Sequence, residues 1–178
     1  MGMFIGLLRA VNVGGRKLPM AELREICSAL AWAKVETYIQ SGNIVFEAGG
    51  DPANLETELE ASLERKLGFA VPVMIRSRGQ WDAIVAANPF AEAAAEEPNR
   101  LLAGIAKAKL APRAAEAIAA KAVAGERVAQ AGGTLWFHYP AGVGASKLTP
   151  SLIDRCAGSP VTARNWRTLL KLQEMVAQ

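Results

Sequence analysis

Two short apolar segments joined at a glycine constrain the fold of this chain more than any other feature. They lie in the stretch VETYIQSGNIVFEA, Val35–Ala48. A tight turn is expected at Ser41–Gly42, because glycine readily takes the positive φ that such a turn requires. A two-residue turn would place Gln40 opposite Asn43 and so fix the register of a β-hairpin. The stretch therefore predicts two paired strands near the beginning of the chain.

The alternation of side chains along these strands separates an apolar face from a polar one. The apolar face needs a core and carries Val35, Thr37, Ile39, Ile44 and Phe46. The other face carries Tyr38, Gln40, Asn43 and Val45. We expect this second face to remain in water or to bind a ligand. The hairpin thus predicts a local fold and gives only an indication of function.

The segments around the hairpin predict the order β-α-β-β-α-β. The apolar run Met3–Val11 indicates a buried central strand, and Pro19 fits the first turn of a helix. After the hairpin, a second helix is expected from Pro52, which an aspartate precedes as a cap, to a stop at Gly68. Val71–Ile75 is then expected to form a fourth strand. This order is that of the ferredoxin-like unit.

The same order of elements recurs in the second half of the chain, after a short helix Trp81–Asn88 and an acidic loop Glu92–Asn99. The expected elements are the strand Leu101–Ala108, the helix Pro112–Val123, the hairpin strands Arg127–Gln130 and Thr134–Tyr139, the helix Ser146–Ala157, the strand Val161–Ala163 and the terminal helix Asn165–Val176. The matching order indicates an internal duplication. The sequence therefore predicts an α+β protein of two tandem ferredoxin-like halves, residues 1–90 and 99–178, packed into one compact unit.

The composition argues against several classes of protein. Hydrophobic residues make up 51% of the chain and charged residues 21%, as in a soluble globular protein. The chain has no apolar run long enough for a membrane span, and its N-terminus lacks the basic region and cleavage site of a signal peptide. Two distant cysteines, Cys27 and Cys156, and a single histidine favour neither a disulfide framework nor a metal cluster. We expect free thiols, no cofactor, no contact with a membrane and a cytoplasmic location.

The net charge of +3 is too small to indicate a nucleic-acid-binding protein, but the charges are unevenly distributed. The first 20 residues contain Arg9, Arg16 and Lys17 and no acid. Near the end of the chain, one acid, Asp154, stands among five bases: Lys147, Arg155, Arg164, Arg167 and Lys171. Acids gather at residues 51–64 and 92–97. The two basic ends could form one positive patch if the fold brings them together, or they could be two solvated faces.

Two glycine-containing loops have features of anion sites. Asn12–Lys17 lies between a strand and a helix N-terminus, where backbone amides favour an anion, although a Gly-Gly turn can be purely structural and no Walker motif is present. In Gly142–Lys147, Ser146 would cap the next helix and Lys147 would lie in its first turn. A cation there is unfavourable unless an anion binds nearby. The alternative is an exposed lysine beside a capped helix.

Two positions near the second hairpin and the terminal helix could also take part in chemistry. Arg164 and Asn165, at the expected helix start, suit recognition of phosphate or carboxylate, whereas Trp166 is expected in the core. His138 is the one imidazole of the chain. A catalytic triad with a serine is conceivable, but no G-x-S-x-G elbow exists, and we expect a partly exposed strand histidine.

Four blocks of sequence resemble one known family. The blocks are LLRAVNVGGRKLPMAELREICSAL, VETYIQSGNIVFE, PAGVGASKL and VTARNWRTLLKLQEM. In this order, from end to end of the chain, they resemble the bacterial domain-of-unknown-function family 1697. Ala10 stands where members of that family usually have glycine. The resemblance implies a bacterial α+β protein and adds no substrate.

We interpret the chain as a protein that binds a phosphate-bearing ligand, either a nucleotide or a nucleic acid. The expected ligand-binding residues are Arg9, Asn12, Gly14, Gly15, Lys17, Tyr38, Gln40, Asn43, Lys147, Arg164, Asn165 and Lys171. One alternative is an enzyme that acts on a small phosphorylated or carboxylated substrate at the same surface. Another is a protein-interaction or oligomerisation module that uses an open sheet face. Turnover would favour the enzyme, and salt-dependent binding without turnover would favour the binding protein.

Overall fold

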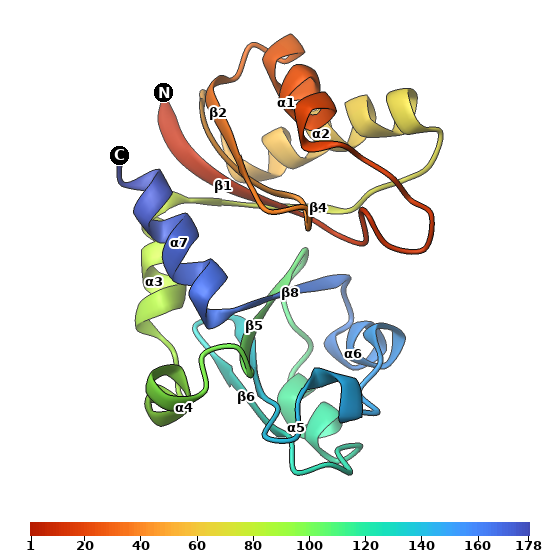
Figure 1. Cartoon of the computed structure of the whole chain (residues 1–178), viewed down its shortest axis with the longest axis vertical. Coiled ribbons are helices and arrows are strands. Elements are labelled where there is room, and N and C mark those ends of the chain that lie inside the picture. Colours follow the sequence, from red (N-terminus) through yellow and green to blue (C-terminus); the bar gives the residue numbers. More distant parts are fainter. The chain divides into compact units, whose positions relative to one another are not determined.

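The protein has an α+β structure with two four-stranded antiparallel sheets and seven α-helices (Figure 1). The structure is a computed structural model that describes every residue from Met1 to Gln178. The chain divides into two compact units, each of which contains one sheet. Unit 1 consists of Met1–Asp82 and Leu172–Gln178, and unit 2 consists of Ala83–Lys171.

Unit 1 is built around the strand order β2-β3-β1-β4, in which β1 is central, as the sequence predicted. Its elements are β1 (Gly2–Leu8), α1 (Met20–Ala29), β2 (Ala33–Tyr38), β3 (Asn43–Ala48), α2 (Pro52–Leu67), β4 (Val73–Ser77) and the beginning of α3 (Arg78–Ala86). Both α1 and α2 cover the same face of this sheet (Figure 1). The core between them includes Leu23, Leu59, Phe46 and Trp32, and the Trp32 and Phe46 rings stack with their centroids 4.0 Å apart. This core anchors the loops that join the strands to the helices.

The ends of α2 follow directly from local sequence signals. Asp51 takes an extended conformation and its side chain accepts a hydrogen bond from the Asn54 amide, which satisfies one of the free donors of the first turn. Pro52 is the first helical residue, and Gly68 ends the helix in the left-handed conformation with φ of 78°. The predicted cap, first residue and stop of this helix are therefore confirmed.

The hairpin forms where it was predicted, but its predicted register is wrong. Tyr38, and not Gln40, lies opposite Asn43, so residues 39–42 form a wider connection. The fully buried Asn43 side chain donates to the Tyr38 carbonyl at 2.9 Å and to Ser41 Oγ at 2.9 Å, which closes this longer loop. Because the slip is by two residues, the paired residues keep their predicted faces. Ile39 is the exception, since it takes a φ of 51° and is 51% exposed instead of joining the core.

The edge strand β4 has its outward amides satisfied by side chains of α2. The Val73 amide donates to Glu60 Oε1 at 2.9 Å, and the Ile75 amide donates to Glu56 Oε1 at 2.8 Å. The two glutamates lie one helical turn apart, so they face the same strand. The Arg76 guanidinium lies 3.5 Å from Glu56, and burial is the main cause that lowers the pKa of Arg76. Helix α2 thus closes one edge of the sheet.

Unit 2 repeats this strand order as β6-β7-β5-β8. Its elements are the rest of α3, α4 (Ala91–Glu96), β5 (Leu101–Ala106), α5 (Ala114–Ala119), β6 (Arg127–Ala131), β7 (Thr134–His138), α6 (Pro150–Ala157), β8 (Val161–Asn165) and α7 (Trp166–Val176), whose last turns belong to unit 1. The predicted second hairpin forms, and because β6 extends to Ala131, which pairs with Thr134, its turn consists of Gly132 and Gly133. The Val161 amide of the edge strand donates to Asp154 Oδ1 at 3.0 Å, as the β4 amides do to glutamates in unit 1.

Several predicted boundaries in unit 2 are wrong. The acidic stretch expected as a loop contains α4, in which alanines supply the helix propensity. Helix α6 begins at Pro150, not at Ser146, because Thr149 is its cap and accepts from the Leu152 amide at 3.2 Å. The two cysteines are free, and burial raises the pKa of the Cys27 thiol to about 12. No helix combines the length and the apolar character needed to cross a membrane.

Candidate functional site

The β1–α1 loop of unit 1 is fastened to the hairpin by a single side chain. Asn12 Nδ2 donates to the Gln40 carbonyl at 2.6 Å and to the Leu18 carbonyl at 2.9 Å, and Asn12 Oδ1 accepts from the Leu18 amide at 2.9 Å. Asn12 has a φ of 57°, which asparagine tolerates better than most residues. The sequence predicted Asn12 as a ligand contact, and the structure shows that its amide also shapes the loop.

Four of the predicted ligand-binding residues line one open hollow of about 440 Å³ in unit 1, which we call the loop hollow. It is lined by Asn12, Gly15, Lys17, Pro19 and Gln40. Lys17 is exposed and is the one charged residue of this lining. The hollow brings together two loops that lie 28 residues apart at Asn12 and Gln40. A negatively charged group entering it would meet a cation and no carboxylate.

The glycines of the loop leave space and donors beside this hollow. Gly14 and Gly15 have φ of 56° and 80°, and an added Cβ at either position would meet no atom within 4 Å. The loop is closed by hydrogen bonds from the amides of Arg16 and Lys17 to the carbonyls of Val13 and Gly15. The Gly14 and Gly15 amides are not used in these bonds, so they can donate to a ligand.

Arg16 does not contribute its charge to the loop hollow in the way the sequence predicted. Its guanidinium donates to the Ala70 carbonyl and lies over the Phe69 ring, 4.5 Å from the ring centroid. Arg16 therefore fastens the loop to the α2–β4 connection. Cation–π contact and a carbonyl acceptor together hold the side chain in place.

The other predicted residues of unit 1 have mixed placements. Gly14 is exposed, and Arg9 and Tyr38 are half-buried. Asn43 is fully buried and its amide group serves the hairpin loop, so its prediction as a solvated ligand contact is wrong. The reason is that its neighbours Ile44 and Val45 are also buried, which leaves β3 without a wet face.

In unit 2, the predicted environment of Lys147 is wrong. Lys147 is exposed, but it lies in the connection before Thr149 rather than in the first turn of a helix. Ser146 does not cap that helix; its hydroxyl donates to Glu126 Oε1 at 2.7 Å and accepts from the Leu148 amide. The hydrogen bond from Ser146 is the main cause that lowers the pKa of Glu126. The unfavourable helix dipole therefore no longer argues for an anion at Lys147.

Arg164 is a structural residue of β8, so its prediction as a surface contact is wrong. It is 8% exposed, and it donates to Thr162 Oγ1 at 2.7 Å and to the Ala163 carbonyl at 2.9 Å. Burial lowers the pKa of its guanidinium to about 10. Asn165 Oδ1 accepts from the Thr168 amide at 2.9 Å and so caps α7, while Lys171 is half-buried. Neither the charge of Arg164 nor the amide oxygen of Asn165 is free for a ligand.

His138 is buried, at 7% exposed, and not partly exposed as the sequence predicted. Arg127 donates to its Nδ1 at 3.0 Å, so the ring proton is on Nε2, which lies 2.8 Å from Glu97 Oε2. This hydrogen bond is the main cause that lowers the pKa of Glu97. Arg127 also lies over the Phe90 ring, 4.8 Å from its centroid. Both ring nitrogens of His138 are occupied by side chains that tie α4 to the β6–β7 hairpin.

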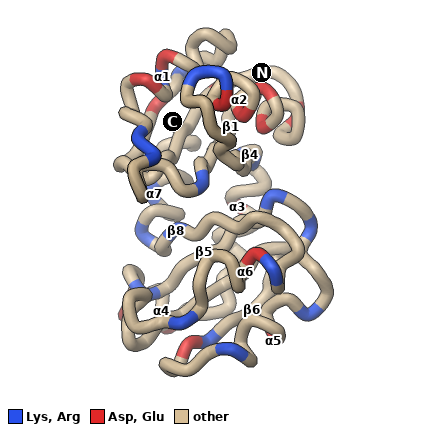
Figure 2. The backbone as a smooth tube through the Cα atoms, turned by 90° about the vertical axis from the view of Figure 1, so that its right-hand side faces the viewer, with Lys and Arg blue, Asp and Glu red and all other residues tan.

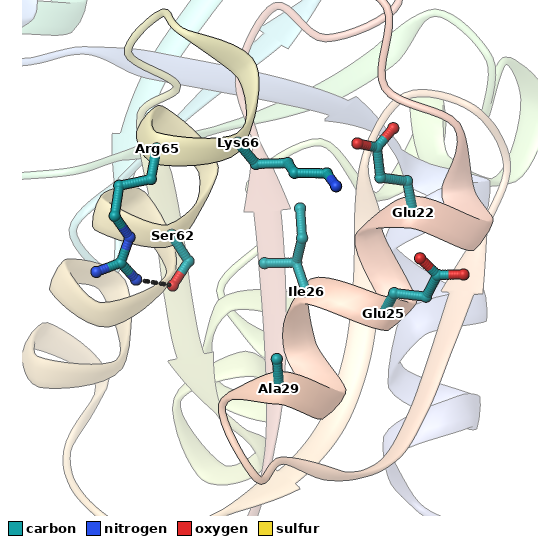
Figure 3. Close-up of a pocket in the computed structure, with 7 residues that line it drawn as sticks. All are labelled: Glu22, Glu25, Ile26, Ala29, Ser62, Arg65 and Lys66. Atoms are coloured by element: carbon teal, nitrogen blue, oxygen red, sulfur yellow. Dashed lines mark hydrogen bonds between the residues drawn. The ribbon is translucent and has the colours of Figure 1, made fainter.

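A second hollow in unit 1, which sequence reasoning missed, lies between α1 and α2 and has a volume of about 390 Å³ (Figure 3). We call it the helix groove, and it is lined by Glu22, Glu25, Ile26, Ala29, Ser62, Arg65 and Lys66. The signal was present in the sequence, because charged residues recur at spacings of three and four in both helices. Such patterns are usual on solvated helix faces, and only the packing of the two helices shows that these residues share a hollow.

Comparison with known proteins adds a family and a fold. A profile described as "Protein of unknown function (DUF1697)" matches residues 1–136, and no curated protein matches the chain. A solved structure described as "The structure of conserved bacterial protein SP0830 from Streptococcus pneumoniae" is similar, with a TM-score of 0.74 and 23% identity, over 100% of this chain and 99% of that one. At this identity the similarity shows the fold alone. The family predicted from the four sequence blocks is confirmed, and the chain belongs to the DUF1697 family of proteins of unknown function.

Proposed function

We propose that the loop hollow binds the phosphate group of a nucleotide or nucleic acid. The observation that carries the proposal is the chemistry of its lining, in which Lys17 is the one charge and no acid is present. The Gly14 and Gly15 amides add donors that need no side chain, and the open space around both glycines leaves room for an oxyanion. A phosphate held by one lysine and backbone amides is a common arrangement at the start of a helix.

The charges of the two units support a ligand with several phosphates rather than one. Unit 2 carries 11 Lys and Arg against six Asp and Glu, whereas unit 1 carries nine against 11. Many acids of unit 1 lie on α1 and α2 (Figure 2), and none of them lines the loop hollow. In unit 2, Lys147 and Lys171 remain candidate phosphate contacts in their own right, separate from the loop hollow, and Arg164, Asn165 and Asn43 leave the proposal. Positive excess in unit 2 would attract a polyanion through its phosphates and with little preference for base.

The proposal includes the architecture and location that the sequence suggested. The β-α-β-β-α-β order and the shared strand order support two ferredoxin-like units. Two free cysteines, one with a buried thiol, support a reducing cytoplasm as the setting. A polyanion-binding protein in that setting would meet nucleotides and RNA at all times.

Fluorescence anisotropy with a labelled single-stranded oligonucleotide over a series of salt concentrations tests the proposal. Each neutralised phosphate contributes about −0.7 to the slope of log K against log salt, so three contacts predict a slope of about −2. Lys17→Glu should weaken binding and reduce the slope by about one contact. Lys66→Glu makes the same change of charge in unit 1 outside the loop hollow and is the matched control. Equal losses in the two variants would show attraction by net charge alone and would refute a site at the loop hollow.

A further inference from the structure

The helix groove carries opposite charges on its two walls. The α1 wall supplies Glu22 and Glu25, and the α2 wall supplies Arg65 and Lys66. Ile26 and Ala29 provide apolar surface between them, and the Lys66 side chain extends from α2 across the space above Ile26 (Figure 3). In Figure 3 the Lys66 side chain extends toward Glu22, whereas the Glu25 carboxylate points away from α2 and the Arg65 guanidinium lies beside Ser62 on its own helix. This separation of charge distinguishes the groove from the loop hollow, whose single charge is positive.

The charges of the groove are unmatched across the gap. Arg65 donates to the Ser62 hydroxyl, three residues away on its own helix, at 3.1 Å. Glu22, Glu25 and Lys66 form no ion pair, although elsewhere in unit 1 Lys34 pairs with Glu47 at 3.2 Å. Exposed ion pairs contribute little free energy, so these side chains can exchange water for the charged groups of a ligand at small cost.

Helix stability explains only part of this arrangement. Glu22 lies in the first turn of α1, and Arg65 and Lys66 lie in the last turn of α2, so each interacts favourably with the dipole of its helix. Glu25 lies in the middle of α1, where the dipole offers nothing to a carboxylate. Its spacing of three from Glu22 nevertheless places both acids on the same wall. Helix dipoles also give no reason for the apolar floor.

We propose that the helix groove binds a short apolar peptide as a zwitterion. The ligand ammonium would lie against Glu22 and Glu25, its carboxylate against Arg65 and Lys66, and its apolar side chain on Ile26 and Ala29. A volume of about 390 Å³ suits a ligand of this size rather than a folded partner. The site lies within unit 1 and is independent of the phosphate site proposed above, so either can fail without the other.

Titration of ¹⁵N-labelled full-length protein with the dipeptide Leu-Leu, followed by amide chemical shifts, tests this proposal. We expect saturable shifts confined to residues 22–29 and 62–66, with a dissociation constant of about 1 mM. N-acetylated Leu-Leu and C-amidated Leu-Leu each remove one ligand charge and should bind about threefold more weakly, as expected for exposed ion pairs. No saturable shift, or equal affinities for the three forms, would overturn the proposal.

Variants of the protein locate the two charges of the ligand. Glu25→Gln should weaken binding of free Leu-Leu about threefold and should not further weaken the N-acetylated form. Lys66→Gln should do the same with respect to the C-amidated form. Glu64→Gln, an exposed α2 residue outside the groove lining, is the matched control and should leave all affinities unchanged. A pattern in which Glu25→Gln and Glu64→Gln have equal effects would overturn the proposed placement of the ammonium.

Discussion

The two units use the same strand order, but unit 1 adds a contact between the connection after its central strand and the hairpin loop. Residues 9–19 reach that loop through Asn12 and the Gln40 carbonyl, and they also reach the α2–β4 connection through Arg16 and the Ala70 carbonyl. In unit 2, the equivalent connection, residues 107–113, contacts the end of α6, where the Ala108 amide donates to Ser159 Oγ and the Ala111 amide to the Ala157 carbonyl. The two connections begin in the same way. The Arg9 amide donates to the Pro72 carbonyl in unit 1, and the Lys107 amide donates to the Pro160 carbonyl in unit 2.

This difference explains why the loop hollow belongs to unit 1. Its hairpin has the wide connection 39–42, whereas the hairpin of unit 2 turns within Gly132–Gly133. A long β–α loop and a wide hairpin loop meet, and a hollow remains between them. The strand order therefore supplies a framework, and loop length decides whether that framework carries a site.

The largest difference in stability between the two units should appear when a glycine of the central strand is replaced. Gly6 in unit 1 and Gly104 in unit 2 both lie close to side chains of neighbouring strands. An added Cβ at Gly104 would lie within 3.3 Å of three side chains, those of Phe137, Val161 and Leu135, whereas at Gly6 it would come that close to Ile44 alone, at 2.8 Å. Gly104→Ala should reduce the free energy of unfolding by about 2–3 kcal/mol and Gly6→Ala by about 1 kcal/mol. Denaturant unfolding of both variants measures this, and a larger loss for Gly6→Ala would contradict it.

The loop fastenings should give the next largest effect. Asn12→Ala removes three hydrogen bonds at an exposed residue of positive φ and should cost about 1.5 kcal/mol, compared with about 1 kcal/mol for Ser159→Ala in unit 2. Asn12→Gly keeps the backbone conformation accessible and is the control for strain. Hydrogen exchange at the Leu18 amide should accelerate in both Asn12 variants. Unchanged exchange there would show that Asn12 does not hold the loop.

A smaller effect is expected at the sheet edges. Glu60→Gln and Asp154→Asn keep an oxygen acceptor but lose its charge, so each should cost about 0.5 kcal/mol. Replacement of either residue by alanine should cost more and should raise exchange at the amide that loses its acceptor, Val73 or Val161. If the alanine variants exchange like the wild type, water replaces the carboxylates without loss.

The loss of stability at low pH should be the smallest effect, and it should come from carboxylates of unit 2. Glu97 and Glu126, both in unit 2, have pKa values below the usual 4.5, mainly because of hydrogen bonds from His138 and Ser146. A carboxylate with a lowered pKa in the folded state stabilises the protein above its unfolded pKa, and this contribution is lost as the pH falls through the folded pKa. Stability should therefore decline below about pH 4.5. Glu97→Gln should flatten this decline, whereas Glu64→Gln in unit 1 should not.

Signals carried by neighbouring residues predicted much of the fold. The cap and stop of α2 at Asp51 and Gly68, the central strand β1 and the two hairpins depend on conformational preferences within a few residues. The register at Asn43 was not predictable in this way, because it depends on burial that no local pattern reveals. The boundary of α6 was missed because Ser146 and Thr149 are both good caps and only their hydrogen bonds distinguish them.

The candidate site was predictable in its residue types and not in its grouping. Lys17 and Gly15 stood out from the sequence because a glycine loop before a helix favours anions. Arg164 also has a cationic side chain that could bind an anion, but packing around β8 buries it. The helix groove requires residues from α1 and α2 that lie about 40 positions apart, as Glu25 and Arg65 do. A sequence pattern identifies each helix face, and only the fold identifies which faces meet.

The carboxylates of α2 and α6 that bind edge-strand amides also protect the protein against aggregation. An edge strand with free amides can recruit a strand from another chain and so begin an aggregate. The amides of Val73, Ile75 and Val161 are already bonded within their own units, so β4 and β8 cannot extend through them. In unit 1, sheet growth is left to the opposite edge, β2, where the pairing is irregular between Ala33 and Glu36 and Lys34 has a φ of 50°. A charged side chain on an irregular edge is a poor template for pairing, so both edges of the unit 1 sheet resist it.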